Sequence, residues 1–201
     1  MSALPPVRRR TLWRLAAGFA AGVALWFGFK EVYERPLAAL AQMALRAFER
    51  PAVTSLTAKG GEVIVERSDF PRDSPRPGLP ADDIHFNFAL LTALFALQPG
   101  FFEGRSLLRL IAAALLLTLV HVTALVFQVQ SVYAMNLGDW SAIHYGRVAR
   151  NIWAGGFHFY LIAGRFAAPF AIWWLVARRA VSENRGWARS RRRKGSRNAP
   201  P

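Results

Sequence analysis

The chain has 201 residues, of which 53% are hydrophobic, and its formal net charge is +14. This length is too short for two sizeable domains, and the apolar fraction, with fifteen Phe and seven Trp, is typical of a protein embedded in lipid. The absence of cysteine excludes disulfides, cysteine-ligated metals and thiol nucleophiles.

Four apolar stretches predict transmembrane helices, at residues 11–29, 84–102, 107–130 and 154–177. The stretch 107–130 is apolar on every face, and at about 1.5 Å of rise per residue it can cross a hydrocarbon core of about 30 Å. The first stretch follows the basic segment 1–10, a pattern shared with cleaved signals. Its length and the spans that follow favour an uncleaved anchor.

Two segments beside the spans have amphipathic spacing and predict helices that lie in the membrane interface. The first is residues 30–50, where apolar side chains recur at helical spacing after Pro36 and the segment ends at Pro51. The second is residues 131–153, which contains turn residues before its apolar positions.

The hydrophilic region between the first two spans is predicted to be a small extracytoplasmic loop, residues 30–83, and not a separate domain. Gly60 and Gly61 form a turn signal, and Glu62–Arg67 is rich in β-prone residues. A short strand or a β-hairpin fits this pattern. Several prolines then interrupt regular structure up to Pro80.

The basic residues gather at the two ends of the chain and predict its orientation. Residues 1–14 carry four Arg and no acid, and residues 178–201 carry nine basic residues against one acid. Four spans place both termini on one side, which the excess of Arg and Lys marks as cytoplasmic. The tail 181–201 is predicted to be disordered and to touch anionic lipid headgroups, because no nucleic-acid-binding motif accompanies it.

The fold class predicted is therefore an all-α membrane protein with one domain over residues 11–180. It has four spans, two outward-facing interfacial helices and the small outer loop.

The four histidines all fall in the half of the protein predicted to be outside. They are His85, His121, His144 and His158, and Asn87 lies close to the first of them. Such a cluster could serve a metal, a haem or a general base. The alternative is that His121 makes a hydrogen bond between helices and the others are interfacial. Because no recognised ligand spacing is present, we predict no metal, no cofactor and no catalytic residue.

Arg165 is predicted to lie near the centre of the last span, where an arginine costs about 2.5–3.5 kcal/mol. No acidic residue lies deep in the predicted spans, so its partner would be a polar group such as Gln128, backbone carbonyls near Pro169, or an acidic group from another molecule. The alternative is a side chain that snorkels to the interface.

The order of these parts resembles the exosortase H-associated membrane proteins, which are encoded beside exosortases. The resemblance lies in the anchor with Trp13 and Trp26, the helix PLAALAQMALRAF, the loop motif GGEVIVER, the stretch FNFALLTALFALQPG and the aromatic last span. It covers roughly residues 11–178. It implies an accessory of a protein-sorting transpeptidase in the bacterial inner membrane. Exosortases use a catalytic cysteine, which this chain lacks, and the resemblance assigns no catalytic residue here.

The first functional hypothesis is a non-catalytic accessory that binds an exosortase-like membrane enzyme or its substrate. An alternative is an enzyme or carrier for an anionic or lipid-linked substrate, and a third is a haem-binding electron carrier. The candidate residues for binding a partner or substrate are Arg165, His121, His158, His85 and Asn87.

Overall fold

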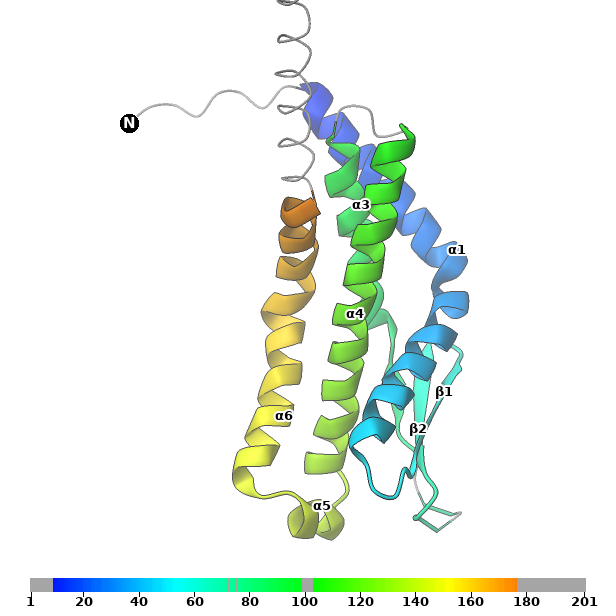
Figure 1. Ribbon diagram of the computed structural model, residues 1–201, viewed down its shortest axis with the longest axis vertical. Coiled ribbons are helices and arrows are strands. Elements are labelled where there is room, and N and C mark those ends of the chain that lie inside the picture. The colour runs from blue at the N-terminus through cyan, green and yellow to red at the C-terminus, as the bar shows by residue number, and fades with distance from the viewer. Residues whose placement is uncertain (1–8, 72, 75, 99–102, 177–201) are drawn as a thin grey trace, which may run out of the picture.

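The computed structural model describes residues 9–71, 73–74, 76–98 and 103–176, and it is mainly helical. Long helices run along one axis, and a small sheet lies beside them at one end (Figure 1). The predicted tail 181–201 and all but the last two residues of the basic segment 1–10 fall outside the described residues. The elements in chain order are α1 Arg9–Phe48, β1 Thr54–Lys59, β2 Glu62–Arg67, β3 Gly78–Pro80, α2 Asp82–His85, α3 Phe88–Ala96, α4 Gly104–Met135, α5 Asp139–His144 and α6 Arg147–Phe159, which continues as the π-helical turn η1 Tyr160–Gly164.

Three helices are long and apolar enough to cross a membrane: Thr11–Phe48, Gly104–Met135 and Arg147–Val176. They correspond to the first, third and fourth predicted spans. The four-span prediction is not confirmed, because residues 84–102 form no comparable helix in the part of the chain described. There α2 ends at His85, and α3 has nine residues, or about 14 Å, half the thickness of the hydrocarbon core.

The predicted interfacial helix 30–50 is not confirmed, because most of it belongs to α1, a single helix of 40 residues. The helix changes direction partway along its length (Figure 1), as expected where Pro36 removes a backbone hydrogen bond. Beyond the bend, Leu37, Ala41 and Leu45 are almost fully buried in a core shared with the sheet and α4. The apolar face thus packs against protein.

The second predicted interfacial helix, residues 131–153, is not confirmed either. Its first residues end α4, its middle forms the short helix α5, and its last residues begin α6. Gly138, with φ of 58°, supplies the left-handed backbone between α4 and α5.

The outer loop contains the expected hairpin and one further strand. β1 and β2 pair antiparallel from Thr54 with Arg67 to Lys59 with Glu62, and the turn uses Gly60 and Gly61 at φ of 62° and 82°. β3 then pairs antiparallel with β2, giving the order β1-β2-β3. The sequence did not predict β3, because its three residues follow a proline-rich stretch and end in a proline.

Side chains of α1 and of Glu49, the residue after it, cover the free edge of β1. Gln42 Oε1 accepts a hydrogen bond from the Leu56 N–H at 2.7 Å, and Arg46 Nε donates to the Thr54 carbonyl at 2.7 Å. Glu49 Oε2 accepts from the Thr54 N–H at 3.0 Å. An edge strand otherwise leaves such groups unpaired, so these three bonds attach the sheet to the end of the first long helix.

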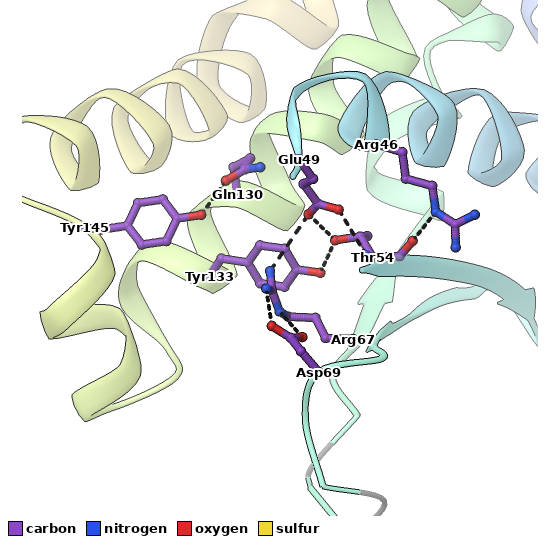
Figure 2. A network of polar contacts seen from close by, with 8 residues as sticks. All are labelled: Arg46, Glu49, Thr54, Arg67, Asp69, Gln130, Tyr133 and Tyr145. Carbon is purple, nitrogen blue, oxygen red and sulfur yellow. Dashed lines mark hydrogen bonds and ion pairs between the residues drawn. The ribbon is translucent and has the colours of Figure 1, made fainter. Parts of the chain in front are cut away.

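Arg67 joins the sheet to α4 and α5. Its guanidinium lies 5.0 Å from the Tyr133 ring centroid and approaches Glu49 to 3.8 Å (Figure 2). The same guanidinium lies 4.7 Å from the ring centroid of Trp140 in α5. It also donates two hydrogen bonds to Asp69, which lower the pKa of that carboxyl. The Thr54 and Tyr133 hydroxyls are 2.8 Å apart in the same cluster. Cation–π and charge-assisted contacts thus fix the sheet against the helices.

α3 packs antiparallel against the first half of α1 at two glycines. A Cβ on Gly22 would lie 2.8 Å from Ala89 Cα and would overlap the Thr92 hydroxyl, and one on Gly18 would overlap Ala96. Glycines four residues apart allow two membrane helices to approach backbone to backbone. This contact holds the short helix α3 against a long one.

We expect Gly22→Leu to separate α3 from α1 and to lower the Tm in detergent by at least about 5 °C, because overpacking costs about 1–3 kcal/mol. Gly28→Leu is the matched control, since a Cβ there meets nothing within 4 Å. The control should leave the Tm unchanged or raise it slightly. Equal Tm values for the two variants in thermal unfolding by circular dichroism would contradict the packing role of Gly22.

Candidate functional site

A buried polar network lies where α1, α3, α4 and α6 meet. His121 of α4, fully buried, is 2.8 Å from the Tyr33 hydroxyl through Nδ1 and 2.7 Å from Asn87 Oδ1 through Nε2. Asn87 Nδ2 lies 3.4 Å from the Tyr160 hydroxyl, which donates to the Ile84 carbonyl. We call Tyr33, Asn87, His121 and Tyr160 the central network.

The direction of the hydrogen bonds at His121 follows from the chemistry of Asn87. Asn87 Oδ1 can only accept, so His121 Nε2 carries a proton and donates to it. Nδ1 of the neutral ring then accepts from the Tyr33 hydroxyl, whose oxygen also lies 3.2 Å from the Thr118 hydroxyl. His121 therefore makes hydrogen bonds between helices through both nitrogens, which is one of the two roles that the sequence had left open for it.

Pro169 explains why Asn87 reaches α6. A proline has no N–H, so the carbonyl of Arg165, four residues earlier, loses its helical partner. Asn87 Nδ2 donates to this carbonyl at 3.0 Å. The π-helical turn Tyr160–Gly164 comes directly before Arg165, so the helix is irregular on both sides of the contact.

His85 lies in a second buried cluster beside the central network. Nε2 of His85 is 3.4 Å from Glu34 Oε1 and 4.0 Å from Asp82 Oδ1, and none of these three atoms has a hydrogen-bond partner among the residues that the structure describes. Their spacing could hold a metal ion. Trp26 opposes that reading, because its indole N–H donates to His85 Nδ1 at 2.8 Å. The proton of the neutral imidazole must then sit on Nε2, the nitrogen a metal would need.

Arg165 has an acidic neighbour in its own chain, contrary to our expectation from the spans. Its Nη1 lies 4.0 Å from Asp83 Oδ1, and its guanidinium is 4.9 Å from the Phe166 ring centroid. Asp82, next to Asp83, binds Lys30 at 2.9 Å. Arg165 is therefore level with Lys30, where the first apolar run ends, and not with the middle of that run.

A lateral groove of about 460 Å³ opens between α1, the segment of α2 and α3, and the helix that follows η1, with Arg165 at its polar end. Asp82, Asp83 and Asn87 complete the polar end. The walls are apolar and come from Phe19, Trp26, Phe86, Leu90 and Phe166. A concave apolar site with a few polar groups at one end is typical of a ligand pocket of this size.

The structure brings four of the five candidate residues to this region and leaves one outside. His85, Asn87, His121 and Arg165 lie in the network, the cluster or the groove, whereas His158 is exposed and its Nδ1 contacts only its own helix, at the Ala154 carbonyl. His144 is also exposed and stacks on Trp140.

Sequence reasoning missed Tyr33, Glu34 and Tyr160. Tyr33 and Glu34 had been assigned to an interfacial helix that the structure does not contain. The sequence does contain a signal for these two residues. A tyrosine and an acid directly follow an apolar span, and no residue breaks the helix before Pro36.

Comparison with known proteins gives one family. The model of the exosortase H-associated membrane proteins matches residues 5–180. The chain belongs to this family. Neither curated proteins nor solved structures gave a match. The resemblance drawn from the sequence motifs is therefore confirmed. In this exosortase H-associated membrane protein, the matched range includes every element of the central network and the groove.

We expect His121→Leu to lower the stability of the protein by about 1–3 kcal/mol, because the Tyr33 hydroxyl and Asn87 Oδ1 lose their buried partner. His158→Leu is the control, since the exposed His158 bonds its own helix, at the Ala154 carbonyl, and nothing else in the described part of the chain. Thermal unfolding in detergent should show a lower Tm for the first variant alone. If His121→Leu unfolds at the wild-type temperature, the central network does not stabilise the bundle.

Proposed function

We propose that the protein is a non-catalytic accessory of an exosortase in the bacterial inner membrane, with both termini cytoplasmic. The family's association with exosortase H supports a membrane protein as partner. The basic ends of the chain support the orientation, because Arg and Lys favour the cytoplasmic side.

The path of α3 supports the four-span topology, because α3 returns the chain to the end of the molecule where α1 starts. Gly18 lies against Ala96, Trp26 bonds His85 and Lys30 bonds Asp82, so α3 runs back along the first half of α1. α4 then starts at the end of the molecule where α1 starts, and the sheet lies at the opposite end (Figure 1). We infer that the sheet and α5 lie outside the cytoplasm.

The proposed docking surface is an exposed apolar row on α6 and its continuation through η1, and this row is the observation that carries the proposal. Its members are separated alternately by four and three residues, the spacing that packs one helix against another. Arg147, Asn151 and His158 are exposed beside the row in its outer half, and such polar groups suit a protein partner better than lipid. The exposed row consists of Val148, Ile152, Gly155, Phe159, Ile162 and Phe166.

We expect Ile152→Arg to reduce recovery of the exosortase at least about tenfold, which corresponds to about 1.4 kcal/mol. The measurement is co-purification of the exosortase H of the same genome with the tagged protein in mild detergent, at matched expression. Met43→Arg is the control, because Met43 is as exposed as Ile152, at 68% and 57%, but lies on α1. Undiminished recovery with Ile152→Arg, or equal loss in both variants, would reject docking through α6.

The orientation has its own test, which uses the absence of native cysteine. We expect Ser74→Cys, in the loop between β2 and β3, to react with an impermeant thiol reagent in intact spheroplasts. Ser196→Cys, in the basic tail, should react only after lysis. Labelling of both cysteines in intact spheroplasts would contradict the proposed topology.

The alternative of an enzyme or carrier for a lipid-linked substrate draws support from the lateral groove, where Arg165 meets apolar walls. The histidines add little to it. His121 uses both ring nitrogens inside the protein, and His85 is fully buried with one nitrogen bound to Trp26.

A further inference from the structure

The polar end of the lateral groove holds two opposite charges that are not fully paired. Arg165 Nη1 and Asp83 Oδ1 are 4.0 Å apart, beyond a hydrogen bond, and the Asp83 side chain is 58% exposed. Among the described residues, no group hydrogen-bonds the buried Arg165 Nε. Asp82 differs, since Lys30 binds it at 2.9 Å. The groove therefore offers one guanidinium and one carboxylate to a ligand.

The charges at this end select the class of ligand. A purely anionic group at Arg165 would be repelled by Asp83 and Asp82, and a purely cationic group at Asp83 would be repelled by Arg165 and Lys30. A group with both charges avoids each penalty. A phosphate accepts from a guanidinium in a forked geometry, and a primary ammonium donates to a carboxylate.

The walls of the groove select an amphiphile. Below the charged end they are apolar and aromatic, from Phe19 and Trp26 of α1, Leu90 of α3 and Phe166 after η1. The charged end is level with Lys30, where the apolar run of α1 ends, so a lipid headgroup placed there leaves its chain beside the apolar walls. This is the depth that a lipid of the surrounding bilayer occupies.

We propose that the lateral groove binds a zwitterionic phospholipid of the ethanolamine type, with its phosphate on Arg165 and its ammonium on Asp83. This lipid site is additional to the proposed docking of an exosortase and does not depend on it. The exposed row and the groove share only Phe166 among their residues.

Binding is measured by native mass spectrometry of the delipidated full-length protein in detergent. The probes are a phosphatidylethanolamine and a phosphatidylglycerol with the same acyl chains. We expect the wild type to bind the ethanolamine lipid at least about fivefold more tightly. Asp83→Asn should reverse this preference, because Arg165 then faces the lipid without its counter-charge. Arg165→Gln should reduce binding of the ethanolamine lipid at least about fivefold.

Two matched variants control for general changes of charge. Arg147→Gln lies on the same helix outside the groove, and Asp73→Asn lies in the loop of the sheet; both should retain the wild-type preference. Equal binding of the two lipids by the wild type, or an unchanged preference in Asp83→Asn, would overturn the proposal. So would a co-purifying apolar peptide that the ethanolamine lipid does not displace. Loss of the proposed exosortase docking would leave this measurement unaffected.

Discussion

The close approach of α1 and α3 at Gly18 and Gly22 is the contact on which the rest of the structure depends. α3 is too short to cross a bilayer alone, and its position is fixed by direct packing against the backbone of a longer helix. That contact sets the register that brings Trp26 to His85 and Lys30 to Asp82. The polar cluster, the neighbours of Arg165 and one wall of the lateral groove all follow from this register.

Polar groups inside the bundle are arranged so that most of them compensate one another. Pro169 leaves a carbonyl without its helical partner, and Asn87 supplies the missing donor while its oxygen fixes the tautomer of His121. Among the described residues, the exceptions beside the groove are the three atoms of Glu34, Asp82 and His85 and the Nε of Arg165; Gln98, Gln128 and Trp173 each hold one more elsewhere. In the first cluster Trp26 keeps the proton of His85 on Nε2, whereas Arg165 borders the groove and faces the exposed Asp83, so only Arg165 is assigned a ligand.

Much of the fold could be predicted because long apolar runs, glycine turns and β-prone segments act locally. The three long helices and the β1–β2 hairpin follow from such patterns. The continuity of α1 could not be predicted from a change of composition at Lys30, because packing against the sheet keeps the amphipathic half helical. The site was predictable as a set of unusual residues, namely His85, Asn87, His121 and Arg165. Their partners Tyr33, Glu34, Asp83 and Tyr160 come from other elements, and only the tertiary register shows which polar residues meet.

The length of α1 has a mechanical consequence. At about 1.5 Å per residue its 40 residues extend about 60 Å, twice the thickness of the hydrocarbon core. One continuous helix thus carries both the glycine contact with α3 and the edge of the sheet, with no flexible linker between them. The sheet is therefore held at a fixed distance from the glycine contact. A partner that binds both the sheet and the long helices contacts two surfaces at a fixed separation. After the first contact forms, the second is intramolecular and has a high effective concentration.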